Sequence, residues 1–364
     1  MRLGIRLYSQ EALPYTEGRS KLRPLIFLIS QQATNIYILT RRSIHIDWLG
    51  DWSVIKKHPR ISTFSSSQIR HFMKRDERGV ASTVGTIMAL LVFMTFLSLF
   101  TNSYVPVWMA DNERQHMNTV MDQFGDLKSK VDSMVVAAEV TGRTDLNMFA
   151  PITLGASGIP VFASPTASLL TYAPYGYANS SIWVNFTYNL GSKFVPVHQL
   201  GGGMLQLYAP NRYYVEQWVT YENGAILVKQ TDGQIVRAVP SISVQKPDLT
   251  SKLNVSWLQV DFVGINASQA GTGTAGLNID LIYFDSQTYD NGSWEMNVTI
   301  TMKTLYGKAW VTYLDQYFSS VSQVTKSDYE LTYTANFDKI ILRLNNTGFF
   351  TYNRAITSVA VQTS

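Results

Sequence analysis

The feature that most constrains this chain is an uncharged run, residues 79–110, in which no Asp, Glu, Lys, Arg or His occurs. About 20 apolar residues cross a bilayer as a helix, and this run is longer than that. A charged cluster, Met73–Arg78, comes directly before it, and a long region rich in strand-forming residues follows. We therefore predict one membrane-spanning segment with a large domain beyond it.

The basic balance of the chain belongs to the region before this run. The whole chain has 30 Lys and Arg against 26 Asp and Glu. Residues 1–79 hold 14 Lys and Arg and 6 Asp and Glu. Residues 80–364 hold the other 16 Lys and Arg and 20 Asp and Glu, a net charge of −4. Basic residues directly before a span favour a cytoplasmic N-terminus and an exported remainder. They are not interleaved with stacking aromatic residues, so no nucleic-acid partner is expected.

The residue types that carry most protein chemistry are scarce. The chain has no cysteine, which excludes disulfides, thiolate zinc sites and cysteine nucleophiles. Only His116 and His198 follow the uncharged run, with no spacing typical of a metal site. There is no nucleophile elbow, P-loop or dinucleotide-binding glycine motif. We expect no catalytic residue, metal or cofactor, and hence a protein that is not an enzyme.

Residues 1–72 differ in composition from the rest. Ile outnumbers Val ten to one there, whereas from Met73 onward Val outnumbers Ile 29 to 14. No Met occurs between Met1 and Met73. We expect Met73 to be the biological start and residues 1–72 to be an upstream extension of the reading frame. The alternative is a small cytoplasmic segment.

Two helices are predicted after the charged cluster. The first is the apolar helix 80–108, with Tyr104 and Trp108 at its exit, where aromatic residues favour the membrane interface. Pro106 is expected to kink or break it. The second is an amphipathic helix over 111–140. Its apolar residues recur at steps of three and four: Met117, Val120, Met121, Phe124, Leu127, Val131, Met134, Val135 and Ala138.

From about Asn147 the pattern changes to strands. Segments such as Ser181–Tyr188 and Leu253–Val263 alternate apolar and polar residues, and a hairpin turn is predicted at Asp232-Gly233. Gly201–Gly203 and Ala270–Gly276 are predicted to be loops. Many short strands with frequent turns indicate an antiparallel β-sandwich over 147–364. The fold class is thus α+β: a long apolar helix and an amphipathic helix, then an all-β ectodomain.

The junction around Gly79 resembles the start of archaeal type IV pilins. Such proteins have a short charged leader that ends in a basic residue and Gly, then a motif like Val-Ser-Pro-x-Ile-Gly-Thr-Ile and an apolar helix. Here Arg78-Gly79 matches the leader's end, and Val80, Gly85, Thr86 and Ile87 match the motif. Ala81 stands for the usual Ser and Ser82 for the Pro. The Glu that bacterial pilins carry at the fifth mature position is replaced by Val84, which fits the archaeal pattern better.

The resemblance implies a function and a set of partners. A prepilin peptidase would remove the leader 73–79 between Gly79 and Val80. The helix would cross the membrane once and then pack with copies of itself, or with other pilins, under the assembly machinery. The small residues that would allow close helix approach are Ala81, Ser82, Gly85 and Ala89. The product would be a cell-surface filament used for adhesion or structure.

Two other functions remain open. One is a single-pass membrane-anchored surface glycoprotein that does not polymerise. The other is an exported enzyme or ligand-binding protein on the same anchor, which the missing catalytic motifs disfavour.

The region beyond the run is rich in N-glycosylation acceptors. With 14 Asn and 40 Ser and Thr among 214 residues, chance predicts about 2.6 Asn-x-Ser/Thr motifs in residues 151–364. Seven occur, and none precedes the span, which favours a translocated and glycosylated domain. The acceptors are Asn179, Asn185, Asn254, Asn266, Asn291, Asn297 and Asn345.

Overall fold

The computed structural model describes residues 66–177, 179–191, 193–248, 251–292, 294 and 296–363, with side chains from Ala81 onward. Predictions that fall on residues 1–65 lie outside this part. The chain divides into two compact units, Met1–Asp76 and Glu77–Ser364, and the second contains every described strand.

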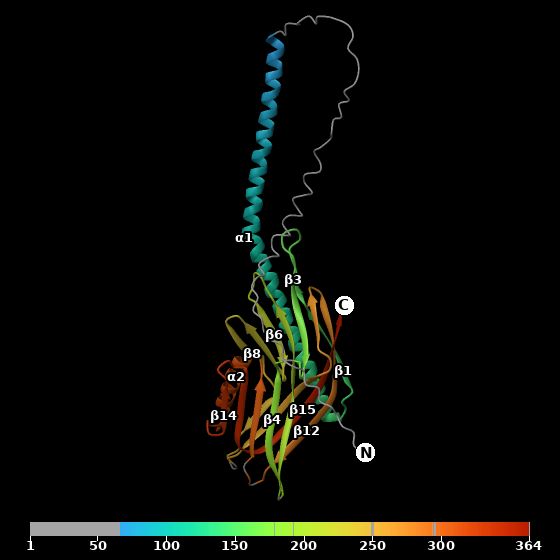
Figure 1. The fold of residues 1–364 in the computed structure, drawn as a ribbon, viewed down its shortest axis with the longest axis vertical. Helices are drawn as coiled ribbons and strands as arrows, with labels where there is room; N and C mark the ends of the chain where they lie inside the picture. Colours follow the sequence, from blue (N-terminus) through green and yellow to red (C-terminus); the bar gives the residue numbers. More distant parts are fainter. Residues whose placement is uncertain are drawn as a thin grey trace, which may run out of the picture. The chain divides into compact units, whose positions relative to one another are not determined.

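A single helix, α1, runs from Ser66 to Thr141 without interruption (Figure 1). The two predicted helices are therefore one, and the predicted break at Pro106 is wrong, although the helix does change direction along its length (Figure 1). Proline removes one helical hydrogen bond and crowds the carbonyl four residues earlier, a cost that surrounding structure can offset. Val105 and Met109, on either side of Pro106, are 4% and 1% exposed. Packing on this face keeps the segment around the proline helical.

The β-domain, residues 146–363, follows α1. Its first eight strands are β1 Leu146–Thr153, β2 Gly155–Ala156, β3 Thr166–Pro174, β4 Ser181–Leu190, β5 Lys193–Ala209, β6 Gln217–Glu222, β7 Ala225–Gln230 and β8 Gly233–Ala238. The remaining elements are β9 Ile242–Gln245, β10 Leu253–Val263, β11 Ala267–Gly271, β12 Thr274–Asp290, β13 Met296–Lys303, α2 Gly307–Ser320, β14 Tyr329–Tyr333 and β15 Lys339–Thr363. The predicted strands 181–188 and 253–263 and the hairpin between β7 and β8 are confirmed.

Within the described residues the strands form one connected sheet. Its main path is β1-β12-β15-β13-β4-β5-β6-β7-β8. The long last strand, β15, pairs with β10, β12, β13 and β14 and so organises most of the domain. The described strand pairs are antiparallel, as predicted, except for β10–β15, which is parallel with Trp257 opposite Tyr352. The coarser prediction of an α+β chain with a β-rich domain is confirmed.

The glycine triplet Gly201–Gly203 lies inside β5, so its prediction as a loop is wrong. Up to Gly202, β5 pairs with β4, and from Gly203 onward it pairs with β3, while β6 joins it from Met204. The triplet is the bend at which one strand passes between two groups of strands. Gly202 and Gly203 have φ angles of +123° and +100°, which L residues with a side chain rarely adopt. A Cβ at Gly201 would overlap the carboxylate of Asp261.

Ala270–Gly276, also predicted as a loop, is mostly strand. β11 ends at Gly271 and β12 begins at Thr274, so only a two-residue turn separates them.

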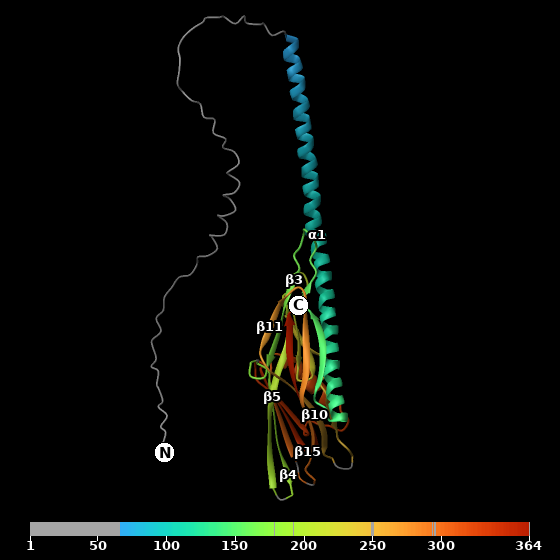
Figure 2. The same ribbon diagram turned by 90° about the vertical axis from the view of Figure 1, so that its right-hand side faces the viewer.

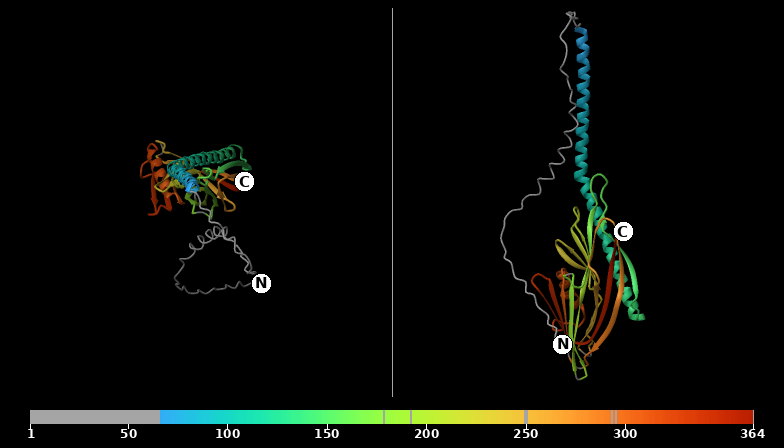
Figure 3. Two further views of the ribbon diagram at one scale, coloured as in Figure 1. Left: turned by 90° about the horizontal axis from the view of Figure 1, so that it is seen from above. Right: turned by 45° about the vertical axis from the view of Figure 1, so that its right-hand side comes forward.

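Two apolar cores lie on opposite faces of shared strands. In β10, Leu258, Val260 and Phe262 face the core under α1, whereas Val255 and Trp257 face the core under α2. The helices themselves lie on different sides of the strands (Figure 3). The β-domain therefore has two apolar cores, one covered by α1 and the other by α2.

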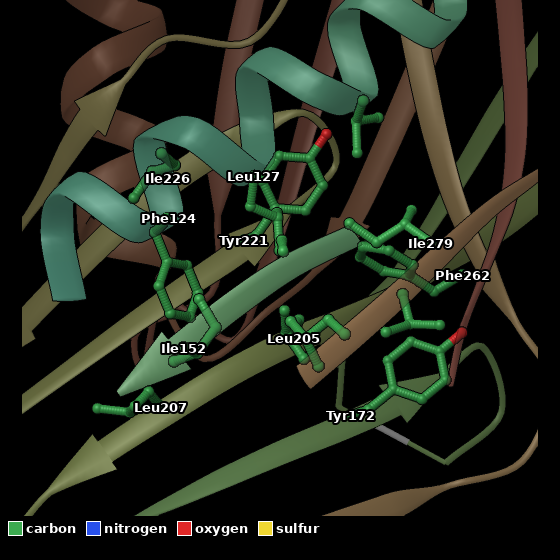
Figure 4. Packing of buried hydrophobic residues seen from close by; sticks show 14 of the residues in the cluster. Phe124, Leu127, Ile152, Tyr172, Leu205, Leu207, Tyr221, Ile226, Phe262 and Ile279 are labelled. Carbon is green, nitrogen blue, oxygen red and sulfur yellow. The ribbon is translucent and has the colours of Figure 1, made fainter. Parts of the chain in front are cut away.

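The amphipathic face predicted for 111–140 is confirmed. Every predicted apolar position is buried or half-buried in the core under α1. Phe124 and Leu127 reach toward Ile152 and Tyr221 of the strands below (Figure 4). Full burial of an aromatic side chain stabilises by about 2–3 kcal/mol, so this face holds α1 firmly on the β-domain.

The helix α2 was not predicted. Its buried residues Gly307, Trp310, Leu314 and Phe318 recur at steps of three and four, as in an amphipathic helix. Gly307 lies so close to the carbonyl oxygen of Phe337 that no Cβ fits.

Candidate assembly helix and its junction with the β-domain

The apolar half of α1 is residues 81–110, and most of it extends beyond the β-domain, with residues 81–96 all exposed (Figure 2). It is the one segment of the described chain that is long and apolar enough, as a helix, to cross a membrane, and its most apolar stretch is entirely unburied. Large apolar side chains stand in the open along it: Val84, Ile87, Met88, Leu90, Leu91, Val92, Phe93, Met94, Phe96 and Leu99. An exposed apolar surface of this size is typical of a segment that contacts lipid or other proteins.

The four predicted helix-packing residues lie at the start of this half. Ala81, Ser82, Gly85 and Ala89 are all exposed. Steps of four residues place Ala81, Gly85 and Ala89 along one face. Nothing lies within 4 Å of the position a Cβ on Gly85 would take. The small-residue face is therefore unoccupied in the single chain.

The predicted processing residues Arg78, Gly79 and Val80 lie within α1. Their side chains fall outside the described part, so the cleavage site stays a prediction.

Coverage of α1 by the rest of the chain starts within the uncharged run. Leu97, Phe100 and Thr101 are half-buried, and Val105 and Met109 are fully buried. Their steps of three and four make one stripe, which continues into the buried face of the attached half, residues 111–141. The β-domain thus covers the helix from about three to four turns before the first charged residue, Asp111.

A small hairpin covers the upper end of this stripe. Ile159 and Ala163 exchange backbone hydrogen bonds of 2.9 Å, which leaves Pro160, Val161 and Phe162 at the tip. The rings of Phe162 and Phe100 meet edge-on, with centroids 5.3 Å apart. Phe100 also contacts Tyr104 and Trp108, at 5.7 and 5.6 Å, which completes a four-ring aromatic cluster.

A buried carboxylate fastens α1 at the point where the attached half begins. Glu113 is 0% exposed and accepts a hydrogen bond of 2.6 Å from the Thr166 hydroxyl. Its two oxygens also accept the backbone N–H groups of Arg212, Tyr213 and Tyr214, at 3.1, 2.8 and 2.7 Å. One helical side chain therefore holds both β3 and the loop between β5 and β6.

Burial and hydrogen bonding act in opposite directions on Glu113. Burial raises the pKa of its carboxyl, but the hydroxyl of Thr166 and the three amides together hold the pKa below its ordinary value. Glu113 is thus ionised in the fold at neutral pH. His116, one turn on, lies 3.1 Å from the carbonyl of Thr153, and burial lowers the pKa of its ring.

Further polar contacts fix the register of α1 against β1. The Gln123 amide oxygen accepts the backbone N–H of Thr153 at 2.8 Å, and its nitrogen donates to the Thr153 hydroxyl at 3.0 Å. Lys130 donates to the carbonyl of Phe149 at 2.9 Å. Sliding or rotating the helix would break these bonds together with those of Glu113.

A second buried carboxylate lies in the other core. Glu222, 5% exposed, accepts the hydroxyls of Ser180 at 2.9 Å and Thr304 at 2.8 Å. Burial raises its pKa to about 7, against the opposing effect of these hydrogen bonds. No cation is paired with it among the described ion pairs. Among the residues that the structure describes, no group of His, Asp or Glu is placed to hold a metal.

A third carboxylate, Asp261, is paired. It accepts Arg354 Nε at 2.7 Å and the Gly202 N–H at 2.8 Å. This contact fills the space beside the glycine bend of β5.

The seven predicted glycan acceptors differ in accessibility. Asn179, Asn266 and Asn297 are exposed, and Asn185, Asn254 and Asn345 are half-buried. Asn291 is 3% exposed, and its side-chain oxygen accepts the backbone N–H of Asn189 at 2.6 Å. A glycan on Asn291 would require this side chain to leave its position. The side chains of the other six acceptors are exposed or half-buried, and their glycosylation stays a prediction.

Glu113 and the hairpin 158–163 were not singled out from the sequence. Glu113 is one carboxylate on a helix rich in charges, and nothing local sets it apart from Glu139. The hairpin does have a signal: no charged residue occurs between Leu146 and Ser192, although this region follows the predicted span.

Comparison with protein-family models, with curated protein sequences and with solved structures finds no match. Inferences about function therefore depend on the residues and geometry of this chain.

Proposed function

We propose that this chain is a subunit of a surface filament, similar in design to archaeal type IV pilins. A prepilin peptidase removes the leader after Gly79, and residues 80–108 first cross the membrane and then pack with the helices of other subunits. The β-domain is displayed outside, carries glycans, and serves adhesion or filament structure. Its partners are copies of this chain or other pilins, and the assembly machinery.

The observation that carries this proposal is the division of α1 into two halves of one continuous helix. The attached half is fixed to the β-domain by a core and by Glu113. The apolar half is uncharged and exposed from Ala81 to Phe96. A rod of this kind can exchange lipid neighbours for other helices while the β-domain keeps its fold.

Cleavage before the apolar run, rather than after it, is what preserves the rod. An ordinary secretory signal is cut beyond its apolar region and the helix is lost. A leader that ends at Gly79 leaves the whole run on the mature chain. The unoccupied face of Ala81, Gly85 and Ala89 then offers a surface for close helix approach.

The main alternative is an anchor that spans the membrane alone and never polymerises. Substituting Gly85→Leu separates the two, since it adds volume on the small-residue face. Ile87→Phe is the matched control, because at about 100° per residue it lies on the opposite side of the helix.

Filament yield and membrane content of the chain would be measured for both variants. A packed core predicts that Gly85→Leu abolishes or strongly reduces filaments, that Ile87→Phe reduces them less, and that both variants still reach the membrane. A simple anchor predicts no filaments containing this chain in any case.

A further inference from the structure

We propose that the hairpin 158–163 is a second membrane contact, whose tip enters the outer surface of the bilayer beside α1. This rests on the proposed function in one respect only: the apolar half of α1 must lie in a membrane before assembly. The hairpin stands beside α1 at the end of the β-domain from which the apolar half extends (Figure 2).

The chemistry of the tip suits a lipid surface. Val161 is fully exposed, Phe162 is 40% exposed, and Pro160 is also exposed. No charged residue occurs anywhere from Leu146 to Ser192, so no charge must be desolvated when the tip meets lipid. Exposed aromatic and aliphatic side chains at the end of a span are typical of the membrane interface.

The contact between Phe162 and Phe100 fixes the depth of the tip. If Tyr104 and Trp108 mark the interface, Phe100 lies about 6 to 12 Å deeper along the helix, inside the hydrocarbon. If instead the hydrocarbon ends after about 20 residues, at the polar Thr101, then Phe100 lies at its boundary. Both placements put the ring of Phe162 at or below the edge of the hydrocarbon.

The hairpin is built as a fixed projection. The two 2.9 Å bonds between Ile159 and Ala163 close it, and the side chain of Asn112 donates to the Ser157 carbonyl at 3.0 Å. A Cβ on Gly158 would overlap the backbone of the opposite arm. The Asn112–Ser157 bond thereby ties the first arm of the hairpin to α1, and the Ile159–Ala163 bonds hold the second arm to the first.

The tip backbone is also suited to shallow insertion. Unpaired N–H groups are costly in hydrocarbon. Pro160 has no N–H, and the N–H of Phe162 donates to the Ile159 carbonyl at 3.1 Å. Val161 has a φ of +71°, a conformation that is costly for a β-branched residue, yet it presents an apolar side chain where Gly or Asn would fit more easily.

The absence of cysteine from the chain allows a direct test. The mature chain would be reconstituted in phosphatidylcholine–phosphatidylglycerol vesicles with a single cysteine that carries an environment-sensitive fluorophore. Val161→Cys reports the tip and Ser164→Cys the base of the hairpin. Leu99→Cys reports the span, and Lys193→Cys, in the hairpin between β4 and β5, reports a site at the end of the β-domain opposite to the apolar half of α1 (Figure 2).

Lipids with a quencher on the acyl chain would then be added. We expect the labels on Leu99→Cys and Val161→Cys to lose most of their fluorescence, that on Ser164→Cys to lose less, and that on Lys193→Cys to lose none. Quenching at Leu99→Cys but not at Val161→Cys or Ser164→Cys overturns the hairpin proposal and leaves the anchor intact. Failure of quenching at Leu99→Cys as well shows that the span itself, and so the proposed function, is wrong.

The competing partner for the tip is the helix of a neighbouring subunit. A label on Val161→Cys that is unquenched in vesicles but protected from aqueous quencher in filaments would assign the tip to that neighbour. This outcome also overturns lipid contact.

Discussion

Glu113 of α1 accepts a hydrogen bond of 2.7 Å from the backbone N–H of Tyr214, 101 residues further along the chain. With the amides of Arg212 and Tyr213 it forms a small cradle of consecutive N–H groups around one carboxylate. Such concave backbone sites hold anions well. In this chain the anion is the Glu113 side chain of α1, so these hydrogen bonds attach the helix to the β-domain.

Substituting Glu113→Gln should lower the free energy of unfolding of the β-domain by about 2–3 kcal/mol, because an amide cannot accept from all of these donors and its own N–H₂ faces them. Glu139→Gln, an exposed position on the same helix, is the matched control and should change it by less than about 0.5 kcal/mol. Urea unfolding of the detergent-solubilised chain, followed by tryptophan fluorescence, measures both.

The same pair of variants predicts a pH dependence. Because the pKa of Glu113 is lowered in the fold, its contribution is fully present above the ordinary value of 4.5 and is lost as the pH falls through the folded pKa. The difference between wild type and Glu113→Gln should therefore be constant from pH 5 to pH 8 and shrink in acid. A difference that grows in acid would contradict the role assigned to this carboxylate.

Glu222 should have the opposite dependence. Its pKa is raised by burial to about 7, so the folded state holds a proton that the unfolded chain releases near pH 4.5. Stability should fall as the pH rises from about 4.5 to 7, by on the order of 3 kcal/mol at most, and then level off. Glu222→Gln should remove this decline, while Glu139→Gln should keep it. An unchanged pH profile in Glu222→Gln would refute the assignment.

The bend in β5 predicts a sharp difference between two glycines. Gly202→Ala places a Cβ 2.6 Å from the Ser181 Cα at a φ of +123°, and should cost at least about 2 kcal/mol of unfolding free energy. Gly233→Ala, at the first residue of β8, meets nothing within 4 Å and should be neutral or slightly stabilising. Equal effects of the two substitutions in thermal unfolding would argue against a fixed bend.

Glycan occupancy should follow accessibility. We expect peptides from the native protein to carry glycans at Asn179, Asn266 or Asn297, which are exposed, and to leave Asn291 unmodified. Mass spectrometry of proteolytic peptides measures this directly. A glycan at Asn291, with none at the three exposed acceptors, would show that the acceptor side chains lie differently in the native protein.

Much of the fold could be predicted because its signals are local and periodic. The buried face of 111–140 repeats over many turns, and strands such as Leu253–Val263 alternate cleanly. The wrong predictions occur where contacts with other parts of the fold determine the local structure. Pro106 stays helical because its neighbours are packed, and Gly201 lies in a strand because Asp261 occupies the space beside it.

The same reasoning explains the missed elements. The parallel pairing of β10 with β15 joins segments far apart in the chain, and no local pattern encodes it. In α2 the residues Trp310, Tyr313 and Tyr317 are strand-prone, and the helix is only 14 residues long. The role inferred for the hairpin tip depends on the contact of Phe162 with Phe100, and this contact is known only from the folded structure.

The central claim is that the apolar rod is retained on the mature chain and packs with other subunits. The most direct test is to purify native surface filaments and to determine, by mass spectrometry, whether this polypeptide is present and at which residue it begins. The account predicts that filaments contain the chain with Val80 as its first residue. Filaments that never contain it, or a native chain that still carries Lys74–Arg78, would contradict the account.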